Sequence, residues 1–244
     1  MLGKLKALTL AAVLWVPAAS RPRLLFQDDF DEPRWNVEFG NRQDATNSNI
    51  AVKYQDGLLK ISPKTLAGKH FSAVLTTEGI FEFAGGYVEA KVRLKTQSGA
   101  WAALWIYNHK ASTDSEDIAK NGIEIDIFEH RATDDWNRYL PYVVSHAVHY
   151  GGYGKYHVAN GAEGWLSDRE WNIIGLDWNA GGYSFFINGE KTWHTKDGLS
   201  FVPSFLVLSV EIKDKFWAGN IPKGGYSGAA QFEVDWIRVW DKKP

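Results

Sequence analysis

Short stretches in which apolar and polar residues alternate recur along most of the chain. Residues 87–95 show the pattern most clearly, with every second position apolar from Val88 to Leu94, and residues 205–212 and 232–240 repeat it. A period of two is typical of strands that bury one face. Gly, Asn and Asp separate the stretches, and no long helical period is present. We therefore predict an all-β sandwich.

One turn between two such stretches has an unambiguous signature. Asn188 and Gly189 lie between residues 183–187 and 190–193, and this dipeptide is the strongest short-range signal for a β-hairpin. Only residues 112–120 have a weak helical pattern, and we predict a loop there. The chain has no internal repeat, low-complexity tract or linker, so one domain is expected.

The N-terminus has the layout of a secretory signal peptide. Lys4 and Lys6 precede an apolar run over residues 7–16, and small residues follow at positions 18–20. The run is too short for a membrane span. We predict a signal peptide over residues 1–20, cleaved after Ala18 or Ser20, and a mature domain over residues 21–244. The protein is then expected to be secreted, into the extracellular space or a periplasm.

Composition excludes several classes of function. Of the 244 residues, 45% are hydrophobic, which suffices for a large core without crosslinks. Without residues 1–20 the chain has 25 basic and 29 acidic residues, a charge of −4, with the basic ones scattered. Neither nucleic acid nor a membrane is expected as a partner. The absence of cysteine excludes thiol chemistry and cysteine zinc sites. A monomer is expected.

Three acids stand inside an apolar, β-rich segment, residues 121–129. On a strand, Glu124 and Asp126 point to one face while the isoleucines at 123, 125 and 127 point to the other. Glu129 would fall on the isoleucine face and bury an unpaired charge, which is costly. One β-bulge after Ile127 would return it to the acidic face. We predict such a bulge, with three carboxylates on one face.

This arrangement has the composition that hydrolysis of a glycosidic bond requires. Retaining glycosidases hold two carboxyl groups roughly 5–5.5 Å apart, and residues two apart on a strand face are separated by roughly 6.5–7 Å. Flexible glutamate side chains reach the shorter distance. The alternative is a solvated polar face, but three acids without a base repel one another.

Aromatic residues make up 14% of the chain and include twelve tryptophans. Most are expected in the core, but sugars stack on indole rings. Trp101 and Trp105 precede the acidic segment, and their spacing places them on one face of a strand, so we predict sugar platforms there. Glu211 and Trp217 are further candidates at the rim of a substrate cleft. The alternative for these two is that they are ordinary loop residues.

Two histidines, His146 and His149, invite a metal interpretation that their spacing opposes. On a strand, residues three apart face opposite sides, so the pair cannot bind one ion without distortion. One is expected to face the cleft and the other to be a satisfied core or loop histidine. Residues 151–154 lack the setting of a phosphate loop and are predicted to form a turn. We predict neither metal nor cofactor.

With these residues placed, the chain resembles family 16 glycoside hydrolases, the laminarinase, lichenase and agarase group. The central motif is residues 124–129, and further likenesses lie in residues 52–61, 75–79, 86–91, 170–178, 186–189 and 232–240. The resemblance implies a concanavalin-like β-jelly roll with two stacked antiparallel sheets and a concave cleft. It implies Glu124 as nucleophile, Asp126 as assisting acid, Glu129 as general acid/base, and His149 as the histidine in the cleft.

The resemblance also implies a secreted, retaining endo-β-glycosidase that acts on a polysaccharide, with a β-1,3-containing glucan as the leading substrate. An endo-hydrolase of an agar-type galactan, a transglycosylase and a noncatalytic lectin are the alternatives. Two departures bear on the substrate. The family's tryptophan-proline pair reads Trp101-Ala102 here, and the segment around Glu211 lacks a glycine-rich ending.

Overall fold

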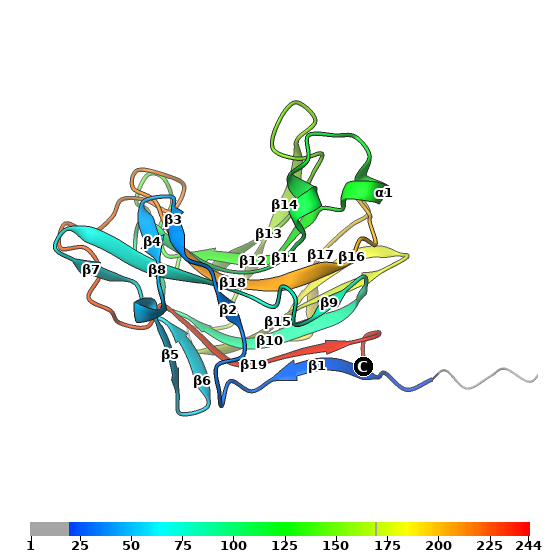
Figure 1. Cartoon of the computed structure of the whole chain (residues 1–244), viewed down its shortest axis with the longest axis horizontal. Coiled ribbons are helices and arrows are strands. Elements are labelled where there is room, and N and C mark those ends of the chain that lie inside the picture. The colour runs from blue at the N-terminus through cyan, green and yellow to red at the C-terminus, as the bar shows by residue number, and fades with distance from the viewer. Residues whose placement is uncertain (1–19, 169) are drawn as a thin grey trace, which may run out of the picture.

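Two β-sheets packed face to face form nearly all of the structure, a computed structural model that describes residues 20–168 and 170–244 (Figure 1). In these residues the smaller sheet has eight strands and the larger has eleven. The predicted β-jelly roll is therefore confirmed. Residues 1–19, nearly all of the predicted signal peptide, lie outside the described part of the chain.

The smaller sheet is centred on β10 (Gly86–Leu94) and β19 (Phe232–Trp240), two long strands that are far apart in the sequence and pair antiparallel along their length. Its order is β17 (Glu190–Thr195), β16 (Gly182–Ile187), β15 (Trp171–Asn179), β10, β19, β6 (Leu58–Ile61) and β5 (Val52–Gln55). Strand β1 (Leu24–Asp28) adds to β19, which brings the C-terminus beside the start of the described chain (Figure 1).

The larger sheet carries the acidic segment in its middle. Its order is β14 (Val158–Trp165), β13 (Val143–Tyr150), β12 (Glu124–Arg131), β11 (Ala100–Tyr107), β18 (Ser204–Ile212), β8 (Lys69–Thr76), β4 (Ala45–Asn47) and β3 (Gly40–Arg42). Three short strands lie off this path: β2 (Asn36–Val37), β7 (Lys64–Leu66) and β9 (Glu82–Phe83). The pairs are antiparallel except for β4 with β8, which is parallel.

Alternation along the strands separates a dry core from an open face. In β10 the apolar positions from Val88 to Leu94 are at most 2% exposed and belong to the cluster between the sheets. In β18 the apolar residues at positions 206, 208, 210 and 212 join that cluster, whereas Phe205 and Val207 join a second cluster on the opposite face of the larger sheet. The larger sheet therefore presents apolar surface on both faces, and the outer one is available to a ligand.

Local predictions are confirmed at one turn and corrected at another segment. Asn188 and Gly189 connect β16 to β17, and both have positive φ, 51° and 87°, as a two-residue hairpin turn requires. The predicted loop at residues 112–120 is partly helical. A 3₁₀ turn, η2 (His109–Ser112), and a short helix, α1 (Ile118–Asn121), flank it, and Asp117 caps α1 by accepting a hydrogen bond from the backbone N–H of Lys120 at 3.2 Å.

The remaining helical element in the described residues is the 3₁₀ turn η1 (Asn49–Ala51). Among the described residues no helix has the length and apolar character needed to cross a membrane.

Candidate active site

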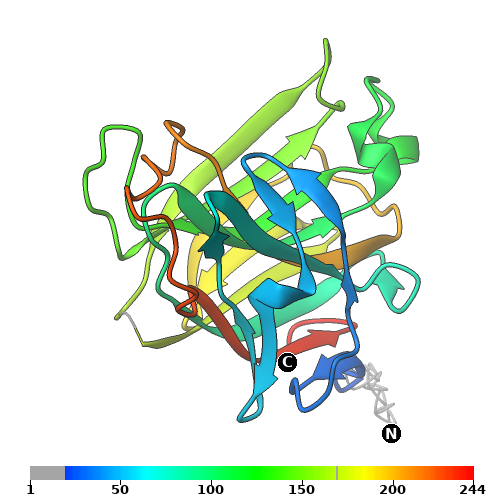
Figure 2. The ribbon, with the colours of Figure 1, turned by 60° about the vertical axis from the view of Figure 1, so that its left-hand side comes forward.

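A cleft of about 650 Å³ lies on the outer face of the larger sheet. Strands β11, β12 and β18 form its floor, while β13 and β14 stand at one edge of the sheet and β3 and β4 at the other (Figures 1 and 2). All eight predicted site residues line it: Glu124, Asp126, Glu129, Trp101, Trp105, His149, Glu211 and Trp217. The residues singled out in the sequence therefore meet in one cleft.

The predicted β-bulge is present in β12. Against β11, Asp126 pairs with Trp105 and Phe128 pairs with Leu104, so Ile127 has no partner of its own. The register against β13 also shifts between Asp126 and Glu129. Ile127 and Phe128 consequently both face the core, where each is 0% exposed. The extra residue returns Glu129 to the cleft face, where it joins Glu124 and Asp126.

The three carboxyl groups are crowded and poorly hydrated. Asp126 is 4% exposed, and Glu124 and Glu129 are half-buried. Burial raises the pKa of Glu129 well above its ordinary value, and the charges of Asp126 and Glu124 raise it further. Burial and Glu124 raise the pKa of Asp126 in the same way. A raised pKa keeps a carboxyl group protonated to higher pH, which is what a general acid requires.

Glu124 differs from Glu129 in having partners that favour its charged form. Burial raises its pKa, but the hydroxyl of Tyr153, the imidazole of His149 and the guanidinium of Arg42 each lower it. The environment therefore separates the pKa values of the two glutamates, and Glu124, at the start of β12, is the more easily ionised. Pairs of carboxyl groups separated in this way divide into an acid and a nucleophile.

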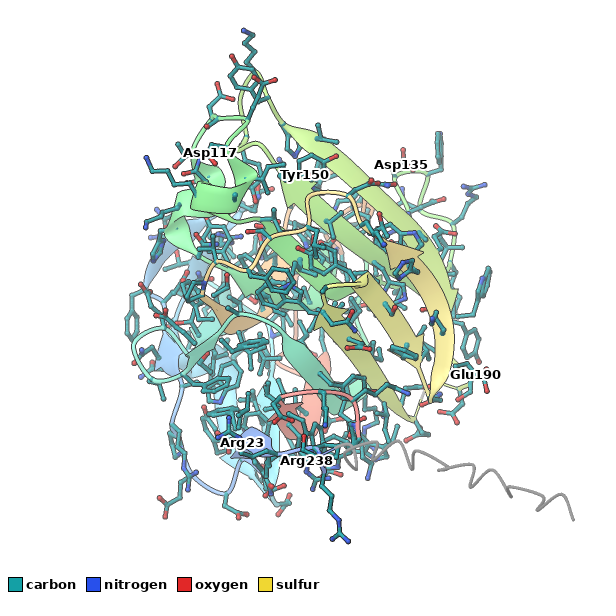
Figure 3. The ribbon with its side chains drawn as sticks, turned by 90° about the vertical axis from the view of Figure 1, so that its right-hand side faces the viewer. Arg23, Asp117, Asp135, Tyr150, Glu190 and Arg238 are labelled. Atoms are coloured by element: carbon teal, nitrogen blue, oxygen red, sulfur yellow. The ribbon has the colours of Figure 1, made fainter. Side chains whose placement is uncertain are left out.

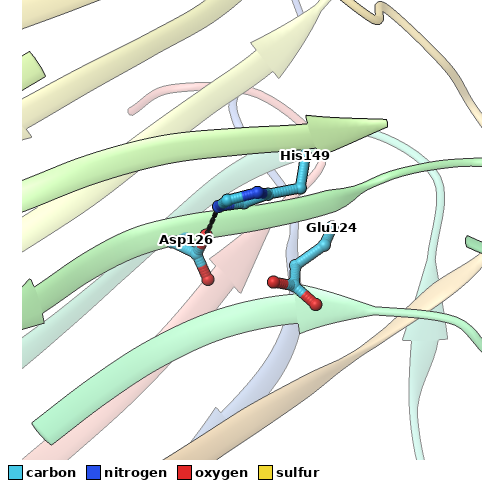
Figure 4. A group of neighbouring side chains, drawn as sticks. All are labelled: Glu124, Asp126 and His149. Carbon is cyan, nitrogen blue, oxygen red and sulfur yellow. Dashed lines mark ion pairs between the residues drawn. The ribbon is translucent and has the colours of Figure 1, made fainter. Parts of the chain in front are cut away.

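His149 faces the acids and His146 does not, as the period of two predicted. The Nε2 of His149 lies 3.3 Å from Oδ2 of Asp126, within ion-pair distance but outside hydrogen-bond geometry (Figure 4). His146 is 1% exposed on the core side, where its Nδ1 contacts the carbonyl oxygen of Ile127 at 2.6 Å and its Nε2 the hydroxyl of Thr192 at 2.9 Å. It is the satisfied core histidine.

Tyr153 is a cleft residue that sequence reasoning missed. It lies in the glycine-rich turn between β13 and β14, and Gly151 and Gly152 there have positive φ, 80° and 77°, so the predicted turn is confirmed. The hydroxyl of Tyr153 donates a hydrogen bond to Oε2 of Glu124. Burial and the charge of Glu124 raise the pKa of Tyr153 and keep it a donor. The aromatic residue between the glycines was the available signal.

Trp101 and Trp105 share the cleft face of β11, as their spacing predicted, but expose only 5% and 7% of their surfaces. Trp105 belongs to the outer apolar cluster, and its Nε1–H donates to the hydroxyl of Ser209 at 3.2 Å. The ring of Trp101 lies edge-on to that of Trp217, with centroids 5.8 Å apart. Each ring is thus fixed by packing before any ligand binds.

Glu211 lies inside the cleft and is paired with a residue that the sequence did not reveal. Its Oε1 accepts a hydrogen bond from Nη2 of Arg42 at 2.8 Å, and Glu211 is only 8% exposed. The guanidinium of Arg42 lies 5.5 Å from the centre of the Trp105 ring. The carboxylates of Glu211, Glu38 and Glu124 raise the pKa of Arg42 against its burial. Arg42 lies alone in a short edge strand, so the sequence around it does not indicate that it pairs with Glu211.

Trp217 marks the point where the cleft continues over the neighbouring strands. A second cavity, of about 520 Å³, lies over β13 and β14 and shares Trp217, Glu129 and His149 with the cleft. Arg131 stacks on the Trp217 ring at 4.4 Å from its centre and donates to its backbone carbonyl. The Trp217 ring is therefore held in place at the junction of the two cavities.

Among the described residues, Glu124, Asp126 and His149 form a group whose possible ligand atoms all lie within 4.8 Å of one another. One cation could contact all three. However, Glu124 already accepts a hydrogen bond from Tyr153, and Nδ1 of His149 already lies 3.2 Å from Nε2 of His157. We call these three side chains the carboxylate–imidazole cluster.

Comparison with known proteins agrees with this geometry. The sequence model of the glycosyl hydrolases family 16 matches residues 39–238. Glucan endo-1,3-beta-glucosidase A1 of Niallia circulans is 23% identical to the chain over 276 residues, which cover 93% of the chain and 39% of that protein. The Clotting factor G alpha subunit of Tachypleus tridentatus is 24% identical over 240 residues, covering 89% of the chain and 34% of that protein. The chain therefore spans well under half the length of both relatives.

Similarity among solved structures concerns the fold. The laminarinase catalytic domain of Thermotoga maritima, solved with cetyltrimethylammonium bromide, superimposes with a TM-score of 0.71 at 22% identity. The match covers 92% of this chain and 100% of that domain.

Proposed function

The chain belongs to glycosyl hydrolase family 16, and from that premise we propose that it hydrolyses internal β-linkages of a polysaccharide with retention of configuration. The best-supported substrate is a glucan that contains β-1,3 linkages, because the Niallia circulans relative is a glucan endo-1,3-beta-glucosidase. The observation that carries the proposal is the bulged strand β12, which brings Glu124, Asp126 and Glu129 to one face of the cleft.

In this proposal the two glutamates have separate roles. Glu124 attacks the anomeric carbon while Glu129 protonates the leaving oxygen, and water then hydrolyses the glycosyl-enzyme with Glu129 as base. The partners of Glu124 favour its carboxylate form, whereas burial and the charge of Asp126 raise the pKa of Glu129 and favour its protonated form. Asp126 lies between them, where its charge state tunes both.

The charge of the cleft favours a neutral polysaccharide. Five carboxyl groups line it, those of Glu38, Glu124, Asp126, Glu129 and Glu211. The arginine that lines it, Arg42, is engaged by Glu211. A sulfated chain would find that cation occupied, and the described residues lining the cleft include no lysine and no other arginine to bind a sulfate group. This supports a glucan over a sulfated galactan and leaves neutral agarose as the alternative within the galactans.

Room on both sides of the acids supports endo-action. The cleft of about 650 Å³ and the adjoining cavity of about 520 Å³ meet at Glu129, His149 and Trp217. A polysaccharide cut internally must place sugar units on both sides of the cleaved bond. The adjoining cavities offer that space, whereas an enzyme that trims chain ends needs one side closed.

The proposal includes export and a monomeric state. Export is supported by the charged, apolar and small-residue layout of residues 1–20. Fusing these residues to a reporter enzyme and measuring export tests it. Size-exclusion chromatography with light scattering tests the monomer.

Activity is tested on a panel of laminarin, lichenan, agarose, porphyran, carrageenan and arabinogalactan, with product sizes followed over time. We expect a ladder of intermediate oligosaccharides from laminarin or lichenan. Glu124→Gln and Glu129→Gln are expected to remove most of this hydrolysis with the fold intact, and Asp126→Asn to be less severe. Near-normal turnover by either glutamate variant would refute the roles. Binding without cleavage by the wild type would favour a lectin.

A further inference from the structure

The imidazole rings of His149 and His157 meet beside the acid trio, and His157 has no role in the site described so far. The Nδ1 of His149, at the end of β13, lies 3.2 Å from Nε2 of His157, which ends the turn before β14. The rings are nearly parallel, at 5°, and their centroids lie 5.5 Å apart. The two facing nitrogens are 3.2 Å apart, whereas the ring centres are 5.5 Å apart, so both nitrogens lie between the ring centres. The hydrogen bond therefore lies in the plane of both rings.

A bond of this kind fixes which nitrogen carries a proton. A neutral imidazole has one N–H donor and one acceptor nitrogen. The other nitrogen of His149, Nε2, faces the Asp126 carboxyl at 3.3 Å (Figure 4). Oδ2 of Asp126 is buried and has no hydrogen-bond partner among the described residues, so an N–H directed at it from Nε2 of His149 supplies the donor that this oxygen lacks. Nδ1 of His149 must then accept, and Nε2–H of His157 must donate.

His157 also supports the second contact to the acids. Its ring centre lies 5.5 Å from that of Tyr153, whose hydroxyl donates to Glu124. His149 at the end of β13, together with Tyr153 and His157 in the turn that follows, thus forms a line of contacts from Asp126 to Glu124. His157 therefore contacts both His149 and Tyr153.

The backbone of this turn is held in place from outside. The N–H of Tyr156 donates to Oδ1 of Asp114 at 2.9 Å, and the N–H of Ser115 donates to the carbonyl of Gly151 at 3.3 Å. A Cβ on Gly152 would lie 2.5 Å from the carbonyl oxygen of Thr113, so the two segments are in close contact. Tyr150, which leads into the turn, and Asp117, which precedes α1, lie at the same end of the molecule (Figure 3).

We propose that His157 is a positioning residue for the hydrolysis proposed above: it donates to Nδ1 of His149 and so holds the N–H of His149 at Nε2, toward Asp126. Without the donor, His149 can take either tautomer. In the wrong one its lone pair faces Asp126, and the favourable contact between strand β13 and the acid trio is lost. In metal sites, the partners that orient a metal-binding histidine contribute about 10- to 100-fold to metal affinity or activity, and we expect an effect of similar size here.

Two substitutions separate the donor from the ring. His157→Phe keeps an aromatic ring against Tyr153 but has no donor, whereas His157→Gln keeps an N–H donor near the Nε2 position without the ring. Tyr156→Phe, one residue earlier in the same turn, is the control, because its contacts to Asp114 use the backbone. We expect His157→Phe to lower kcat on laminarin by about 10-fold or more with KM little changed, and His157→Gln and Tyr156→Phe to stay near the wild type.

The tautomer itself is measured by long-range ¹H–¹⁵N correlation NMR of the free protein, with the His149 signals identified by their loss in His149→Asn. We expect an Nε2–H tautomer in the wild type and a mixture in His157→Phe. An Nδ1–H tautomer in the wild type, an unchanged tautomer in His157→Phe, or equal losses of kcat in the Phe and Gln variants would overturn the proposal. The NMR measurement needs no substrate, so it decides the role of His157 even if the proposed activity fails.

Discussion

Tyr153 donates a hydrogen bond from its hydroxyl to Oε2 of Glu124, so a turn between two strands holds the carboxylate that we propose as the nucleophile. This contact lowers the pKa of Glu124 against the effect of burial. The nucleophile must be ionised to attack, and its ionisation sets the acidic limb of the pH–rate profile.

Tyr153→Phe is therefore expected to move that limb. Removing a donor to the charged form raises the pKa of Glu124, so the acidic limb of kcat/KM shifts to higher pH while the alkaline limb stays in place. The profile of kcat/KM on laminarin measures this. Tyr139→Phe, an exposed tyrosine on the β12–β13 connection, is the control. An acidic limb that stayed in place, or moved to lower pH, would contradict the assigned contact.

The raised pKa values of Asp126 and Glu129 predict a stability cost at neutral pH. A group whose pKa is higher in the folded than in the unfolded protein favours folding when protonated, and this stability is lost as pH rises through the folded-state pKa. Asp126→Asn removes the titration. We expect its Tm to exceed that of the wild type by an amount that grows as pH rises.

Calorimetry between about pH 4 and about pH 8 measures the difference. Glu190→Gln, at the exposed β16–β17 hairpin, serves as control (Figure 3). A difference that was constant or shrank with pH would mean that Asp126 is not held protonated.

The exposures of the cleft tryptophans predict opposite effects for two of them. Trp105→Ala opens a hole in the outer apolar cluster and is expected to cost about 3–5 kcal/mol of unfolding free energy. Trp217 is half-buried at the junction of the cavities. Trp217→Ala is expected to weaken oligosaccharide binding by about 1–3 kcal/mol, with little change in Tm. Urea unfolding and calorimetric titration, the latter in a Glu124→Gln background, measure the two quantities. If Trp105→Ala instead lowered the oligosaccharide affinity and Trp217→Ala lowered the unfolding free energy, Trp105 would be the sugar-binding residue and Trp217 the packing residue.

The Arg42–Glu211 pair is expected to be costly to break from one side. Arg42→Ala leaves a carboxyl that is 8% exposed without its partner, which costs about 1–3 kcal/mol of unfolding free energy. The double variant with Glu211→Gln should recover part of this loss. Arg23→Ala, which breaks an exposed pair with Asp241, is the control and should change stability by less than about 1 kcal/mol. Additive losses in the double variant would show that the two side chains do not interact.

The features that the sequence predicted are those that depend on neighbouring residues. The bulge in β12 follows from the conflict between Glu129 and the isoleucine face, and the separation of His146 from His149 follows from the period of two. Both are settled within one strand by the cost of burying a charge or leaving a polar group unpaired.

The features that were missed depend on contacts between distant segments. Arg42 and Glu211 are 169 residues apart, and Tyr153 and Glu124 are 29 apart. Strand β14 also gave no signal, because it is an edge strand exposed along most of its length and needs no apolar alternation. Which side chains meet across the cleft is decided by the order of the strands, which local patterns do not encode.

The stereochemistry of the first product tests the central claim most directly. If Glu124 forms a covalent intermediate and Glu129 returns the proton, two displacements leave the new reducing end with the configuration of the bond that was cut. Proton NMR during the first turnovers on a β-1,3-glucan reads this configuration before the anomers equilibrate. We predict that the β-anomer forms first, and an initial α-anomer would contradict the assignment of Glu124 and Glu129.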